Sequence, residues 1–259
     1  MTTQHAPTRP DVPDMTEFRE NGHAALPRAL PAALIDGLRG TFLSYVAQKH
    51  EGLSGFEKSL GASATKATFS LSEAPQPIRD LVCAPALAEI AARALGADRV
   101  RVLHFNGFFK PGGGMATPWH QDMGYIPLDS EDVVTTWVPL VGVTEEMGPL
   151  VFASGSHHAG AQPLTDLGTR YPLRRAPEMA PGDVSIHHGW TAHCSLPNRS
   201  KQIRAAVAIS YFPDGARLRL PDGGPPMMAS LRAECMPGLV PGDLVTTSAT
   251  PLVFPPRAA

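Results

Sequence analysis

The chain has 259 residues, of which 43% are hydrophobic and 18% are charged, and its formal net charge is −2. This length allows a sizeable hydrophobic core. The near-neutral charge gives no electrostatic footprint for nucleic acid or for an anionic membrane surface, so we expect neither kind of partner.

Three features favour a cytoplasmic protein. Residues 1–13 are polar and contain prolines, without the apolar stretch that a secretory signal needs. No apolar run approaches the length of a membrane span. The three cysteines, Cys83, Cys194 and Cys235, are scattered and odd in number, which predicts neither a disulfide framework nor a CxxC metal site.

The first part of the chain predicts helices. Apolar side chains recur at helical spacing between residues 31 and 49: Leu34, Ile35, Leu38, Phe42 and Val46. Pro31 suits the first turn of this helix. A second helix is predicted over residues 77–95, with Gly96 as its C-terminal cap and a kink or a division at Pro85.

From about Val100 the pattern changes to short apolar runs separated by turn residues, which predicts strands. The runs cover residues 100–110, 133–143, 149–153, 183–188 and 205–212. Helices followed by many closely spaced strands favour a mainly β fold, a double-stranded β-helix (jelly roll) with flanking N-terminal α-helices. We expect a single domain over residues 1–259, with a loose arm at 1–13 and a loop-rich tail at 218–259 that wraps the barrel.

The most informative motif is His120-Gln121-Asp122. In an extended segment, side chains two apart point the same way, so this motif places an imidazole and a carboxylate on one side. A second imidazole from a distant strand would complete two nitrogens and one oxygen on one face of a metal ion, as in non-haem Fe(II) oxygenases. His193 is the favoured candidate, because it stands at a strand end where a ligand can face a cavity. His187 and His188 are better interpreted as strand residues that form ordinary hydrogen bonds.

Arg204 follows His193 by eleven residues. Its guanidinium is a fixed cation with a planar fork, suited to binding the carboxylate of an organic acid. By strand alternation, small side chains share its face: Ala206, Ala208 and Ser210. A cation on such a face leaves room for a ligand, although the same segment also fits an exposed edge strand with Arg204 in solvent.

Asp122 distinguishes between two chemistries of an iron site. A carboxylate at this position leaves three adjacent metal positions for a bidentate acid and for O2. Iron-dependent halogenases of this architecture lack the carboxylate, so that a halide can bind. Asp122 therefore argues against halogenation.

With these residues, the chain resembles the phytanoyl-CoA dioxygenase family of Fe(II)- and 2-oxoglutarate-dependent oxygenases. The resemblance runs from about Phe18 to Phe212 and rests on motifs that occur in order. They are residues 18–22 (FRENG), 120–125 (HQDMGY), Trp137, 146–150 (EMGPL), 154–157 (SGSH), 181–183 (PGD) and 188–198 (HGWTAHCSLPN), followed by Arg204. One departure is Cys194, directly after the last histidine, where the family often has glycine.

The resemblance implies a set of site residues. Fe(II) would be bound by His120, Asp122 and His193. The distal carboxylate of 2-oxoglutarate would pair with Arg204, assisted by the hydroxyl of Ser195. Further residues occupy places where relatives contact or enclose the cosubstrate: Trp137, Asn106 and Lys66.

The resemblance also implies the reaction. Fe(II), the cosubstrate 2-oxoglutarate and O2 would together oxidise a C–H bond of a small molecule, with release of succinate and CO2. Hydroxylation, epimerisation, ring closure and desaturation are all open outcomes, because the residues do not separate them.

The substrate is expected to be an apolar secondary metabolite. The chain has no basic cluster for the phosphates of coenzyme A, and its Ala/Arg/Pro/Gly-rich composition is typical of a high-GC bacterium, where family members often act in antibiotic biosynthesis. Candidate pocket residues flank the His-x-Asp motif: Phe105, Phe108, Met115, Tyr125 and Ile126. The same residues also fit a hydrophobic core.

An alternative from another class is a jelly roll that holds Zn(II) or another divalent metal. Such a protein would be a hydrolase, an isomerase or a non-catalytic binding module, since zinc also uses three protein ligands and one open position. Arg204 argues against this alternative, because a zinc hydrolase needs no clamp for a dicarboxylic acid.

Overall fold

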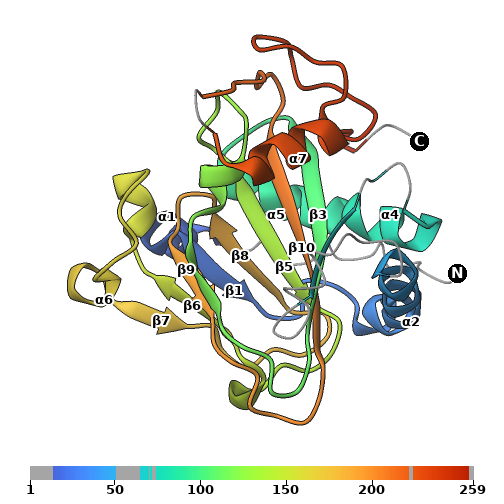
Figure 1. Ribbon diagram of the computed structural model, residues 1–259. Coiled ribbons are helices and arrows are strands. Elements are labelled where there is room, and N and C mark those ends of the chain that lie inside the picture. The colour runs from blue at the N-terminus through green and yellow to red at the C-terminus, as the bar shows by residue number, and fades with distance from the viewer. Residues whose placement is uncertain (1–13, 51–64, 70, 72–73, 222–223, 257–259) are drawn as a thin grey trace, which may run out of the picture.

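The computed structural model describes residues 14–256, apart from 51–64, 70, 72–73 and 222–223. Two antiparallel β-sheets form a curled, mainly β jelly roll with helices packed beside it, which confirms the predicted fold (Figure 1). Among the described helices, none has the length and apolar character that a membrane span requires.

The larger sheet has seven strands. In spatial order they are β1 (His23–Leu26), β8 (Val184–His188), β5 (Val134–Pro139), β10 (Arg204–Pro213), β3 (Val100–Lys110) and β11 (Leu252–Phe254), with β2 (Thr65–Phe69) also paired to β3. The smaller sheet consists of β4 (Thr117–His120), β9 (His193–Ser195), β6 (Leu150–Ala153) and β7 (Leu173–Arg175). All five predicted strand runs are present, but the run at 133–143 is shortened to β5.

The helices and short turns complete the fold. They are α1 (Thr16–Asn21), α2 (Ala32–His50), α4 (Gln76–Val82), α5 (Pro85–Leu95), α6 (Leu167–Arg170), α7 (Pro226–Cys235) and the 3-10 turns η1 (Asp122–Tyr125), η2 (Glu145–Met147) and η3 (Ser156–Ala159). The second predicted helix is divided, because a new helix begins at Pro85, where the missing N–H has no cost. Gly96 ends it in the left-handed conformation, with a φ of 61°.

The main hydrophobic core lies between the helices and the outer face of the larger sheet. Helix α5 packs against β10, β5 and β11. Strand β10 sends Val207, Ile209 and Tyr211 into this core. Because side chains alternate along a strand, Arg204 and Ser210 face the opposite way, into the space that the second sheet encloses. The expected division of this strand into two faces is therefore confirmed.

The tail at residues 218–259 contains more regular structure than the loops we expected. Helix α7 lies across one end of the larger sheet, where it contacts β3 and η1 (Figure 1). Strand β11 adds to the edge of the same sheet beside β3. The tail thus closes one end of the space between the sheets.

Candidate metal and cosubstrate site

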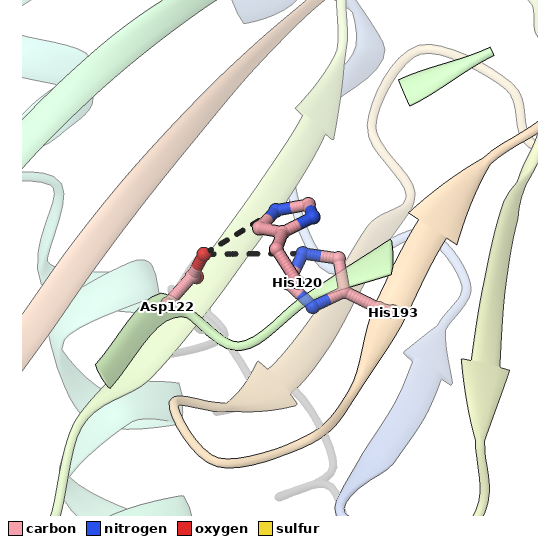
Figure 2. A group of neighbouring side chains, drawn as sticks. All are labelled: His120, Asp122 and His193. Carbon is pink, nitrogen blue, oxygen red and sulfur yellow. Dashed lines mark ion pairs between the residues drawn. The ribbon is translucent and has the colours of Figure 1, made fainter. Parts of the chain in front are cut away.

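Three predicted metal ligands converge at one point of the barrel. His120 ends β4 and His193 begins β9, and the two residues are partners in the register of this antiparallel pair. Their rings lie on the same side, with centroids 4.1 Å apart. Oδ1 of Asp122 lies 3.7 Å from Nε2 of His120 and 3.9 Å from Nε2 of His193. Dashed lines mark these two pairs in Figure 2. One ligand atom from each residue lies within 4.8 Å of the others, close enough to share an ion.

The local conformation of the His-x-Asp motif differs from the expected one. The strand ends at His120, and Asp122 begins the turn η1, so the motif is not one continuous extended segment. Gln121 remains extended, and its buried side chain donates to the carbonyl oxygens of Gly160 and Trp190 at 2.8 and 2.7 Å. These bonds hold the turn so that the carboxylate of Asp122 faces the two histidines.

Each of the two candidate histidine ligands is held with Nε2 free to bind a metal. Nδ1 of His120 lies 2.9 Å from the carbonyl oxygen of Pro118, and Nδ1 of His193 lies 3.0 Å from that of Thr191. Because a carbonyl only accepts, Nδ1 carries the proton and Nε2 keeps its lone pair. Burial, together with the neighbouring imidazoles, holds the pKa of His193 well below its usual value, so this ring is neutral at pH 7.

Asp122 is oriented by its second oxygen. Oδ2 accepts hydrogen bonds from Oγ1 of Thr135 at 3.0 Å and from Nε2 of His187 at 3.2 Å. Burial raises the pKa of Asp122, but the hydrogen bond from His187 lowers it, and the net result is a pKa well below the usual value. A carboxylate and two imidazoles on one side of a metal fit Fe(II).

The other two histidines near the motif have the roles of ordinary strand residues. His187 lies in β8 and supports Asp122 from behind, as partners of metal ligands commonly do. Nδ1 of His188 accepts the backbone N–H of Trp190 at 3.1 Å. Neither residue belongs to the ligand group, which supports the choice of His193 as the third ligand.

The three ligands open onto a cavity of about 470 Å³, and Arg204 lines the same cavity. The arginine is only 2% exposed, which removes the alternative of an edge strand in solvent. Its Nη1 donates to the carbonyl oxygen of Gly148, and its Cζ lies 5.6 Å from the ring centre of Trp137. Burial lowers the pKa of Arg204 to about 10, so it remains a cation at pH 7.

Gly148 has a conformation that other residues rarely adopt, with a φ of +77°. A Cβ at this position would lie 2.3 Å from the carbonyl oxygen of Leu196. Glycine therefore allows the loop to bring its carbonyl against Arg204.

Within the described part of the chain, the buried polar atoms that have no hydrogen-bond partner include two atoms of residues that line the cavity. They are Nε of Arg204 and Oδ1 of Asn106. Buried polar atoms in proteins are nearly always hydrogen-bonded, and leaving one unpaired costs about 1–3 kcal/mol. The Nε–H of Arg204 can donate to a carboxylate, so a buried cation beside a metal site fits an acid that binds the metal at one end and Arg204 at the other.

The remaining cosubstrate candidates are placed as follows. Ser195 and Trp137 line the cavity, and Ser195 Oγ donates to Oγ1 of Thr117 at 2.9 Å. Cys194, the departure from the family pattern, also lines the cavity, and burial raises the pKa of its thiol to about 11, so it stays neutral. The backbone of Lys66 pairs with Phe108, but its side chain lies outside what the structure describes.

Of the five residues that the sequence predicted to line the substrate pocket, three do so and two do not. Phe108, Tyr125 and Ile126 line the cavity. Phe105 belongs to the core cluster on the other face of β3, because strand alternation turns it away from the cavity. Met115 is 63% exposed and does not line the cavity.

Helix α7 contributes a wall of the cavity that the sequence interpretation missed. Its lining residues are Met227, Ser230, Leu231 and Glu234. His104 and Trp119 add to the same cavity from β3 and β4. The sequence could have placed His104 in the cavity, since it lies on the same face of β3 as Asn106. No sequence pattern indicated that helix α7 would line the cavity.

The comparisons with known proteins agree with this geometry. The model of the phytanoyl-CoA dioxygenase (PhyH) family matches residues 18–206. The chain belongs to the phytanoyl-CoA dioxygenase family. This is a family of iron- and 2-oxoglutarate-dependent dioxygenases, so the zinc hydrolase and the non-catalytic module are not supported.

Relatives with known activities differ in what they do. A 1-deoxypentalenic acid 11-beta-hydroxylase of Streptomyces exfoliatus is 34% identical over 32% of this chain and 35% of its own length. The dioxygenase lolE1 of Epichloe uncinata is 28% identical over 81% of this chain and 85% of its own. The first two curated relatives are matched over only 35% and 39% of their lengths.

Among solved structures, the fold is similar to that of the alpha-ketoglutarate-dependent epimerase SnoN from nogalamycin biosynthesis. The TM-score is 0.76, with coverage of 94% of this chain and 95% of that chain. The two sequences are 22% identical, so this likeness shows the fold alone.

Two histidines beside the site, one buried and one partly buried, make the fold sensitive to acid. Burial, with repulsion from neighbouring imidazoles, lowers the pKa of His23 and of His188 to about 4 in the folded protein. In the unfolded chain both titrate near 6.5, so the unfolded state binds more protons as the pH falls from 6.5 to 4. We expect the free energy of unfolding of the metal-free protein to fall by about 2 kcal/mol per histidine between pH 7 and pH 5.

Urea unfolding at the two pH values measures this loss. His23→Gln is the matched variant, since its amide can still bond Ser154, which now contacts Nε2 of His23 at 2.7 Å. The variant should lose about 2 kcal/mol less stability than the wild type over this pH interval. An equal loss in both proteins would contradict the assignment.

Proposed function

We propose that this protein is an Fe(II)- and 2-oxoglutarate-dependent dioxygenase that oxidises a C–H bond of an apolar small molecule. In this proposal, Fe(II) is held by His120, Asp122 and His193, and 2-oxoglutarate is held at its far carboxylate by Arg204. One observation carries the proposal: a facial group of metal ligands and a buried, incompletely bonded arginine line the same cavity.

The protein's own residues supply position and environment. Bound iron, with 2-oxoglutarate and O2, supplies the oxidising power that yields succinate and CO2 and removes hydrogen from a substrate carbon. Asp122 and the two histidines leave the opposite metal positions open to the cavity. Arg204 fixes the direction of the dicarboxylate, with Trp137 against its guanidinium.

The substrate half of the cavity favours an apolar molecule of small or medium size. Its walls include Phe108, Trp119, Tyr125, Ile126 and Leu231. A few polar groups in such a pocket fix the orientation of the bound molecule, and Ser230 of α7 is one such group. The epimerase from nogalamycin biosynthesis favours a role in antibiotic biosynthesis, and the Streptomyces hydroxylase favours hydroxylation, with epimerisation and ring closure as the other outcomes.

The compartment we propose is the cytoplasm. All three cysteines are free thiols in the structure, and two of them are buried. Free thiols of this kind are usual in a reducing compartment.

Turnover of 2-oxoglutarate tests the proposed function. The purified protein with Fe(II), ascorbate and O2 should form succinate slowly alone, and faster with a substrate of the correct class. A panel of apolar polycyclic compounds and free amino acids, scored by succinate and by product mass, separates the substrate classes. Faster succinate release with amino acids alone would contradict the apolar class, and no succinate under any condition would contradict the activity.

A further inference from the structure

Lys110, the last residue of β3, is a second buried cation beside Arg204. Its side chain has no exposed surface. The register of β3 and β10 pairs Lys110 directly with Arg204. Directly opposed residues in an antiparallel pair point to the same side, with Cβ atoms about 5 Å apart. Two positive charges therefore lie next to each other inside the protein.

No carboxylate in the described part of the chain forms an ion pair with either cation. Like charges directly opposite each other destabilise a sheet, and a buried charge without a partner is costly. Burial, and then the charge of Arg204, lower the pKa of Lys110 to about 7, which reflects this missing compensation. The pair thus forms an anion site for which the described residues provide no anion.

The hydrogen bonds of Lys110 run through Ser195. Nζ donates to Oγ of Ser195 and to the carbonyl oxygen of Leu196, both at 2.7 Å. An ammonium can only donate hydrogen bonds, so the hydroxyl oxygen of Ser195 accepts from it. The proton of the serine hydroxyl is therefore left to be donated to another group. Here that proton is donated to Thr117, and both Ser195 and Thr117 line the cavity. Lys110 itself lies behind Ser195 and does not line the cavity.

We propose that Lys110 is a positioning residue for the distal carboxylate of the cosubstrate. Its ammonium fixes Ser195 as a hydrogen-bond donor into the cavity and adds a second positive charge behind the carboxylate that Arg204 binds. Charge-assisted hydrogen bonds are stronger than neutral ones, and a chain of them is polarised in one direction. This inference rests on the proposed use of 2-oxoglutarate and adds a residue to its binding.

The test compares two acids under anaerobic conditions with Fe(II) present. 2-Oxoglutarate and 2-oxopentanoate offer the metal the same 2-oxo acid group, but only the first has a distal carboxylate. Calorimetry gives the dissociation constant of each acid for the wild-type protein and for Lys110→Met. We expect Lys110→Met to weaken the binding of 2-oxoglutarate about tenfold and the binding of 2-oxopentanoate by less than about twofold. Equal weakening of both acids, or of neither, overturns the role of Lys110.

Lys110→Gln is the conservative variant, and it guards against misfolding of Lys110→Met. Its amide can donate to Ser195 and to the Leu196 carbonyl but carries no charge, so the loss of preference should be intermediate, about threefold. In a Ser195→Ala background, Lys110→Met should change the preference for 2-oxoglutarate over 2-oxopentanoate less than it does alone. The reason is that the Ser195 hydroxyl, which connects Lys110 to the cavity, is gone. An undiminished effect in that background would refute the path through Ser195.

The outcomes separate this inference from the proposed function. A wild-type protein that binds 2-oxoglutarate with Fe(II), beside Lys110 variants with unchanged preference, refutes only the inference. A wild-type protein that binds no 2-oxoglutarate in the presence of Fe(II) refutes both.

Discussion

Replacing Asp122 by alanine should abolish succinate formation and weaken Fe(II) binding at least a hundredfold. The change removes the only anionic ligand of the group, while His120 and His193 remain. Loss of even a residue that supports a metal ligand costs about 10–100-fold in metal affinity, so loss of the ligand itself should cost at least the upper end of this range. Anaerobic equilibrium dialysis of Fe(II) measures the affinity.

The matched control is His158→Ala. His158 is an exposed histidine outside the ligand group and outside the cavity. It should keep the Fe(II) affinity and the activity of the wild type. Thermal unfolding of the metal-free proteins checks that Asp122→Ala still folds, since Thr135 and His187 lose their common acceptor. Wild-type Fe(II) binding by a folded Asp122→Ala protein would remove Asp122 from the metal site.

Replacing Arg204 by methionine should weaken the binding of 2-oxoglutarate by roughly a hundredfold or more. Removing one partner of a buried, hydrogen-bonded charge pair costs about 2–5 kcal/mol, and each 1.4 kcal/mol is a factor of ten in affinity. Fe(II) affinity should be unchanged, because Arg204 is not in the ligand group. The measurement is the dissociation constant of 2-oxoglutarate with Fe(II) present and O2 absent.

Arg204→Lys separates charge from geometry. Lysine keeps the positive charge but lacks the planar fork, so its affinity for 2-oxoglutarate should lie between those of Arg204→Met and the wild type. The monocarboxylate 2-oxopentanoate should bind all three proteins with similar affinity. If Arg204→Met binds 2-oxoglutarate as the wild type does, the distal carboxylate lies elsewhere.

The metal site could be predicted from the sequence, because its chemistry restricts the residue types. Only a few side chains bind iron, and His120, Asp122 and His193 occur in the order and setting of a known series of motifs. The prediction of a continuous strand through the motif was wrong. Local turn formation at Asp122 depends on the hydrogen bonds of Gln121 to distant segments, which a short window of sequence does not contain.

Other parts of the pocket depend on register and packing. Lys110 precedes Pro111 and a run of glycines, which is the pattern of a solvated strand end, and only its pairing with Arg204 shows that it is buried. Phe105 was assigned to the wrong face, although His104 and Asn106 mark the cavity side of β3. Helix α7 was missed because its sequence has little helical period, and its position follows from the closing of the barrel.

The central claim is that iron and 2-oxoglutarate bind together in one cavity through this set of residues. Anaerobic addition of Fe(II) and then 2-oxoglutarate, followed by visible absorption, tests it most directly. We predict a weak charge-transfer band that needs both components, saturates at one equivalent of Fe(II), and is absent with Zn(II) and in His193→Ala. A wild-type protein that binds Fe(II) but shows no such band at any 2-oxoglutarate concentration would contradict the account.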